Sequence, residues 1–190
     1  MEGRLIRRTL GALKAGLGKL SLHRTDDPRQ RINRRWSLCQ LLTAMLAGIC
    51  AGCSSLAEVE ALTLVLTGAG RKVLGLGRRV PDTTLRDLLV KLEPTELRGR
   101  LWHQVRQAHR QKALKHPWIT GHDQGMLNVL ILRRIAYNLV ALFRGLTQRS
   151  EDRRLTPWAT VIRGFYIALV AATEQQIAGL RTRTEAPEIR

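Results

Sequence analysis

The apolar residues of this chain recur at intervals of three and four positions, and no stretch alternates apolar and polar residues as a half-buried strand does. Residues 36–52 show the helical spacing most clearly, because they carry no charged side chain. Aromatic residues make up only 4% of the chain. Leucine, isoleucine, valine and alanine must therefore form the core, which favours helices over sheets. The sequence predicts an all-α protein of about six to eight helices.

Local signals place these helices along the chain. Ser55 and Glu58 have the spacing of a capping box, and Asp82 or Thr83 is expected to cap a later helix. The glycines of residues 68–77 predict a break around a short turn at 71–74. The predicted helices span Leu5–Leu20, Trp36–Gly52, Ser55–Leu66, Leu85–Leu92, Pro94–Lys115, Met126–Phe143 and Trp158–Ala172.

Three regions are expected from this pattern. Residues 1–35 form a basic N-terminal helix and an exposed basic connector, the latter at 22–35. Residues 36–116 form a helical bundle that contains a segment resembling a helix-turn-helix. Residues 117–190 form a C-terminal region built on a pair of long helices.

The charge of the chain is large and uneven. Its 32 Lys and Arg side chains exceed its 15 Asp and Glu side chains, which gives a net charge of +17. Such a charge attracts phosphate backbones or anionic lipid. From Leu97 to Ser150, however, ten basic side chains accompany one carboxylate, Asp123. Cleavage of nucleic acid with metal ions needs several converging carboxylates, so the composition favours binding over chemistry.

The clearest candidate for DNA recognition is the segment from Val80 to Arg86. A short helix, a glycine turn and a second helix would present Thr83, Thr84 and Arg86 to the major groove, unless the segment is a plain helical hairpin with solvated arginines. The basic face of the 94–115 helix fits phosphate contact or solvated surface better than base reading. The candidate DNA-binding residues are Arg78, Arg79, Thr83, Thr84, Arg86, Arg98, Arg106, Arg110 and Lys112.

Other chemical motifs are weaker. Cys50 and Cys53 have the spacing of a zinc or redox pair, but no further ligand pair lies at a suitable distance along the chain. We expect two small buried thiols, no metal site and no cofactor. Cysteine usage predicts a reducing, cytoplasmic setting. The uncharged run at 36–52 is slightly short for a membrane span, so no membrane insertion is expected. No catalytic residue is assigned, and His122 beside Asp123 does not by itself make a catalytic pair.

Several motifs together resemble bacterial insertion-sequence transposases of the DDE superfamily, close to the H-repeat-associated group. The first half resembles their N-terminal helical region, and the second half resembles their C-terminal helical tail. The motifs are Asp27-Pro28-Arg29, the apolar helix 41–51, Ser55-Leu56-Ala57-Glu58-Val59, Val80-Pro81-Asp82-Thr83-Thr84-Leu85, Leu92-Glu93-Pro94, Leu132-Arg133-Arg134-Ile135-Ala136-Tyr137-Asn138-Leu139, Phe143-Arg144, Thr147-Gln148-Arg149-Ser150 and Pro157-Trp158.

The resemblance implies a central ribonuclease-H-like domain with two aspartates and a glutamate that hold magnesium for strand cleavage. This chain instead runs directly from Lys115 into His116-Pro117-Trp118. No position receives the family's carboxylates, and no catalytic role transfers to Asp123. The expectation is a transposase remnant that binds DNA without cleaving it.

Two other functions stay open at this point. One is an active transposase or nuclease subunit that a full-length partner complements with the catalytic domain. The other is an inert pseudogene product, whose helices expose apolar faces once the central domain is gone. The expected partners are DNA, and either a second copy of the chain or a full-length transposase.

Overall fold

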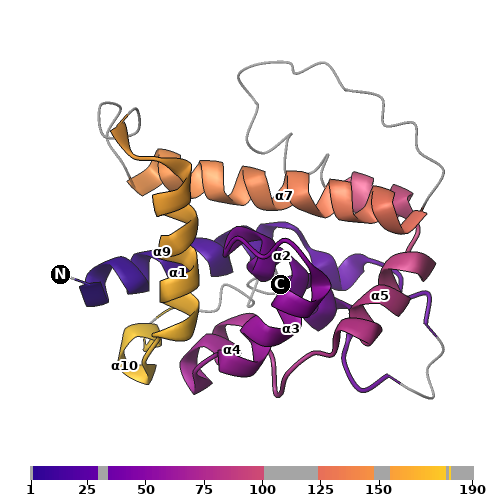
Figure 1. Ribbon diagram of the computed structural model, residues 1–190, viewed down its shortest axis with the longest axis horizontal. Helices are drawn as coiled ribbons and strands as arrows, with labels where there is room; N and C mark the ends of the chain where they lie inside the picture. The colour runs from indigo at the N-terminus through magenta and orange to yellow at the C-terminus, as the bar shows by residue number, and fades with distance from the viewer. Residues whose placement is uncertain (1, 30–33, 101–123, 148–154, 179, 181–190) are drawn as a thin grey trace, which may run out of the picture.

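The computed structural model describes residues 2–29, 34–100, 124–147, 155–178 and 180, and these residues form helices and no strand. The predicted all-α class is thereby confirmed. Figure 1 shows the long helix α7 lying across the other elements, with α5 and α9 toward its opposite ends. The elements are α1 (Glu2–Lys19), the 3-10 helix η1 (Leu22–Arg24), α2 (Leu38–Cys50), α3 (Leu56–Val65), α4 (Gly68–Leu74), α5 (Asp82–Lys91), α7 (Gln124–Thr147), α9 (Trp158–Val170) and α10 (Glu174–Ile177).

Side-chain caps begin several of these helices. Ser37 and Gln40 form a complete capping box at α2, which the sequence pattern had not singled out. At α3 the Ser55 hydroxyl accepts from the Glu58 N–H as predicted. The Glu58 carboxylate, however, accepts from the N–H and hydroxyl of Ser54, so the predicted box is only half right. The capping box of α2 and the Ser55 cap of α3 each tie the residue before the helix to its first turn.

The glycine-rich stretch forms a helix where a break was predicted around 71–74. The Thr67 hydroxyl caps α4, and the helix ends at Gly75, whose φ of 67° lies in the left-handed region that suits glycine. Gly70 lets this helix approach α9, because a Cβ there would collide with the Leu169 carbonyl oxygen. Close packing against α9 therefore stabilises a helix that the glycines alone would disfavour.

One hydrophobic core unites the described helices. Helix α1 packs extensively against α9, and α2 and α5 both pack against α7. Elements far apart in the sequence thus lie side by side (Figure 1). The core draws on all three regions expected from the sequence, through side chains such as Leu10, Leu13, Leu46, Leu85, Ile135 and Phe165.

Helix α7 was predicted to be buried almost all round, and this is wrong for one face. Leu132, Ile135 and Ala136 are buried, whereas the opposite face exposes Met126, Leu130 and Tyr137. By length and composition alone, its segment Gln124–Gly145 could cross a membrane. Packing against α1, α2 and α5 gives the inner face of the same segment the character of a core helix.

The segment that follows α1 is not simply an exposed connector. Leu22 and Thr25 are buried, and the Arg100 guanidinium donates to the Thr25 hydroxyl at 3.2 Å. Residues 94–100 are helical, which confirms the start of the predicted 94–115 helix. The rest of that helix lies outside the described residues. The buried leucine and this hydrogen bond hold the segment against the core.

Asn128 fastens α7 to the end of α5. Its side chain is fully buried, and its amide nitrogen donates to the carbonyl oxygens of Leu89 at 2.8 Å and Leu92 at 2.6 Å. The Gln124 amide also donates to the Leu92 oxygen, at 2.8 Å. The last carbonyl groups of a helix have no partner within the helix. Side chains of α7 therefore complete the C-terminal end of α5.

Replacing Asn128 with alanine should lower the free energy of unfolding by about 1–3 kcal/mol, because buried carbonyl groups lose their donor. Chemical denaturation would measure the change. Gln175→Ala is a matched control, since Gln175 is exposed on α10 and its truncation should change stability little. Equal stability of the Asn128 variant and the wild type would contradict this account of how α5 is held.

Candidate nucleic-acid interface

Two side chains of α3 position the start of α5. The Thr63 hydroxyl accepts from the buried Val80 N–H at 3.0 Å, and the Glu60 carboxylate accepts from the Asp82 N–H at 3.0 Å. The residue at the N-cap position is Pro81, which makes no side-chain cap. The predicted capping by Asp82 or Thr83 is therefore wrong. A carboxylate from a neighbouring helix satisfies the first N–H and also suits the positive end of the helix dipole.

The packing of α4 and α5 differs from the pairing expected for a helix-turn-helix. Helix α5 packs on α3 and α7, whereas α4 packs on α2, α9 and α10. In a helix-turn-helix the first helix supports the second. Here α3 and α7 support α5, and α5 still presents its first turn at the surface.

A groove lies along one face of α5. Its α5 wall consists of Thr83, Thr84, Asp87 and Lys91, at the spacing of one helix face. The segment that leads into α2 forms the other wall. The groove has a volume of about 550 Å³, and this second wall comprises Pro28, Arg29, Arg34 and Trp36.

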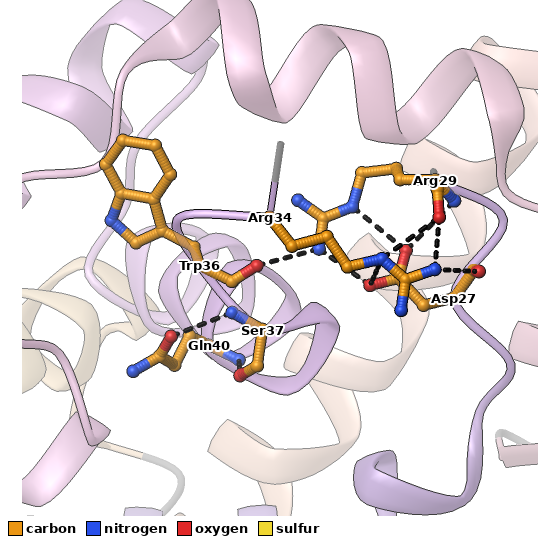
Figure 2. A network of polar contacts seen from close by, with 6 residues as sticks. All are labelled: Asp27, Arg29, Arg34, Trp36, Ser37 and Gln40. Atoms are coloured by element: carbon orange, nitrogen blue, oxygen red, sulfur yellow. Dashed lines mark hydrogen bonds and ion pairs between the residues drawn. The ribbon is translucent and has the colours of Figure 1, made fainter. Parts of the chain in front are cut away.

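A network of polar contacts fixes the second wall (Figure 2). The Arg29 guanidinium donates to both carboxylate oxygens of Asp27, at 2.9 and 2.8 Å, and to the Trp36 carbonyl oxygen at 2.8 Å. Arg34 donates to the carbonyl oxygens of Asp27 and Arg29, each at 3.0 Å. The capping box of α2 follows directly, and the Gln40 amide continues to the Gly75 carbonyl at 2.7 Å. The wall is thus tied to α2 and to the turn after α4.

Asp27 stays ionised within this network. Burial raises the pKa of its carboxyl group, but the hydrogen bonds from Arg29 and the charges of Arg29 and Arg34 outweigh burial and leave the pKa below its usual value. The Arg29 side chain is only 9% exposed, against 30% for Arg34. Arg29 therefore acts mainly as a structural partner of Asp27, and Arg34 is the cation of this wall that faces solvent more.

The two arginines before α5 have different surroundings. The Arg78 guanidinium lies over the Trp36 ring, 4.8 Å from its centroid, which is the geometry of a cation–π contact. Arg79 pairs with the Glu60 carboxylate at 3.3 Å, and its side chain is 56% exposed. Arg78 therefore belongs to the groove edge beside Trp36, while Arg79 belongs to the cap of α5.

The structure brings together only part of the predicted set. Thr83 and Thr84 line the groove, and Arg78 lies at its edge. Arg86 is exposed on a neighbouring face of α5, and Arg98 is exposed in the helical stretch 94–100. Arg106, Arg110 and Lys112 lie outside the described residues.

Sequence reasoning missed the basic and aromatic residues of the groove, namely Arg29, Arg34, Trp36 and Lys91. The available signal was a tryptophan directly after a run of arginines in the connector. Basic residues interleaved with an aromatic side chain are typical of nucleic-acid surfaces. The prediction of an exposed connector at 22–35 gave no reason to expect that this segment forms one wall of a groove.

Cys50 is buried in the core whereas Cys53 is only partly buried, so the predicted burial of both thiols is confirmed for Cys50 alone. Burial raises the pKa of the Cys50 thiol to about 12 and also raises the pKa of Cys53. A thiolate is the form that binds metal or attacks disulfides, and burial of this kind disfavours it. Among the residues that the structure describes, no group of three or more His, Cys, Asp or Glu side chains could hold a metal ion.

Comparisons of the chain with protein-family models, with curated proteins and with solved structures found no match.

The Asp27 network makes stability depend on pH. The folded state holds the pKa of Asp27 below its usual value, so the stabilisation is present above the unfolded pKa of about 3.9 and is lost as pH falls through the folded pKa. Asp27→Asn should therefore destabilise the protein at neutral pH, and the difference from wild type should shrink below about pH 4. Denaturation measured from neutral to acidic pH tests this. Asp26→Asn removes a neighbouring exposed carboxylate and should show neither effect.

The hydrogen bond that the Thr63 hydroxyl accepts should contribute more to stability than the packing of its methyl group. Thr63→Val keeps the shape but leaves the buried Val80 N–H without an acceptor, which should cost about 1–3 kcal/mol of unfolding free energy. Thr63→Ser keeps the hydroxyl and loses one methyl group, so its cost should be near ~0.8 kcal/mol. Thermal or chemical denaturation compares the pair. A serine variant less stable than the valine variant would contradict the assigned role of the hydroxyl.

Proposed function

We propose that this chain is a DNA-binding protein of transposase origin that lacks the catalytic domain of the DDE superfamily and does not cleave DNA. The motifs at 27–29, 55–59, 80–85 and 132–139 support the origin. The observation that carries the binding function is the surface around the start of α5. There, Arg34, Thr83 and Thr84 line one groove, with Arg78 at its edge.

The side chains around this groove suit phosphate contact. Arginine and lysine bind phosphate by charge and hydrogen bonds, and threonine hydroxyls donate to phosphate oxygens. Neither Thr83 nor Thr84 has a side-chain hydrogen bond within the part of the chain that the structure describes. Their hydroxyl groups are thus available to a ligand.

The same helix also offers groups that fit base reading. Thr83 and Arg86 are exposed on the first two turns of α5. Arginine makes bidentate hydrogen bonds to guanine, and threonine contacts bases through its hydroxyl and methyl groups. Arg98, Arg106, Arg110 and Lys112 are assigned to phosphate contact. In this proposal α5 is supported by α3 and α7, so it does not depend on a helix-turn-helix pairing with α4.

Binding to duplex DNA should weaken steeply with salt, since each phosphate contact releases a counterion. We expect affinity for a duplex of about 20 base pairs to fall by at least ~10-fold between about 50 and 200 mM salt. Arg86→Ala should weaken binding further and relax any preference selected from a randomised duplex pool. Arg163→Ala removes an exposed charge on α9, at the other end of the molecule from α5 (Figure 1), and should change affinity less.

Two results would contradict this proposal. Absence of salt-dependent binding to any duplex would remove the DNA-binding function. Magnesium-dependent nicking by the purified chain, abolished by Asp123→Asn, would contradict the non-cleaving assignment. Association with a second copy or with a full-length transposase stays a prediction that sedimentation can test.

A further inference from the structure

We propose that the groove beside α5 binds an unpaired DNA strand, with one base stacked on the outer face of Arg78 and the adjoining phosphate held by Thr83, Thr84 and Arg34. This inference rests on the proposed DNA-binding function and names the form of DNA that the groove takes.

The shape of the groove fits one nucleotide better than a duplex. Its volume of about 550 Å³ lies within the range of about 300–1,000 Å³ that is usual for small-ligand pockets. A duplex is read by an element that protrudes into its major groove, whereas here α5 lines a hollow together with Arg29, Arg34 and Trp36. The hydrogen bonds of Arg29 to Asp27 and to the Trp36 carbonyl oxygen keep that hollow formed before a ligand arrives.

The stacked pair at the groove edge supplies a platform for a base. Arg78 covers Trp36 at 4.8 Å, and Arg78 is itself exposed. Unpaired bases stack on aromatic rings and on arginine guanidinium planes. A base laid on the solvent side of Arg78 would extend the stack that Trp36 begins. The Trp36 indole N–H has no hydrogen-bond partner within the described ranges. The ring can therefore shift slightly when a base stacks on Arg78 without breaking a hydrogen bond of its own.

The charges along the groove decide where a phosphate lies. Asp87 pairs with Lys91 at 2.8 Å, which neutralises that end of the groove and makes it unfavourable for a second anion. At the other end the free hydroxyl groups of Thr83 and Thr84 face the wall that carries Arg34. A phosphate should therefore lie near the first turn of α5, between Thr83 and Thr84 on one wall and Arg34 on the other.

Fluorescence anisotropy of labelled DNA tests the inference with the full chain. The probes are a ten-nucleotide oligo(dT) and a blunt duplex of about 20 base pairs, at one fixed salt concentration because affinity depends on salt. Arg78→Lys keeps the charge and removes the planar stacking surface. We expect it to weaken oligo(dT) binding about five-fold or more, with duplex binding changed less than about two-fold. Arg163→Lys, on the exposed surface of α9, is the matched control and should weaken oligo(dT) binding less than about two-fold.

The outcomes separate this inference from the proposed function. Unchanged oligo(dT) binding in Arg78→Lys would overturn the stacking site. Equal losses for oligo(dT) and duplex would overturn it too, because the contact would then be to phosphate alone. In both cases duplex binding by the wild type would leave the proposed function standing. If neither probe binds the wild type, both proposals fail. Trp36→Leu, which keeps an apolar side chain without a ring, should repeat the selective loss.

Discussion

The position of α5 depends on hydrogen bonds that other helices make to its two ends. From α3, Thr63 and Glu60 bind the backbone N–H groups of Val80 and Asp82, and from α7, Asn128 binds the carbonyl groups at the other end. The backbone N–H and C=O groups at the ends of a helix have no hydrogen-bond partner within the helix. In α5 these groups bind neighbouring helices and so orient it. A helix of ten residues is only marginally stable alone, so this fastening holds the groove wall in place.

The second wall depends on one buried ion pair. Asp27 and Arg29 lie within hydrogen-bond distance at 2.8 Å with both side chains largely covered. Removing Asp27 would leave the covered Arg29 charge without its partner, which costs more than the pair contributes. The pair also holds the Trp36 carbonyl and so positions the ring that Arg78 covers. A single carboxylate thus organises Arg29 and Arg34, two arginines of the basic connector.

Much of the fold could be predicted from the sequence, because helical spacing of apolar residues reports which face is buried. The start of α3 at Ser55 follows from a local rule as well, because its hydroxyl caps the first turn. Contacts between distant segments have no such signature. The capping of α5 by Glu60, the approach of Gly70 to α9 and the pairing of Trp36 with Arg78 each join residues that local patterns do not relate. For that reason Thr83 and Thr84 could be predicted as site residues. The Arg34-Arg35-Trp36 pattern could indicate a nucleic-acid contact but not its position across the groove from α5.

Several of the few carboxylates in this chain have structural roles. Asp27 holds Arg29, Glu58 binds Ser54 before α3, Glu60 caps α5, and Asp87 pairs with Lys91. Each of these four acids supports a helix end or a basic neighbour. Lone carboxylates placed in this way fix the local fold, and the 32 Lys and Arg side chains of the chain far outnumber its 15 acids. This excess gives the surface a positive potential that attracts anions. Among the described residues, the groove with Thr83 and Thr84 on one wall and Arg34 on the other offers an anion a defined place to bind.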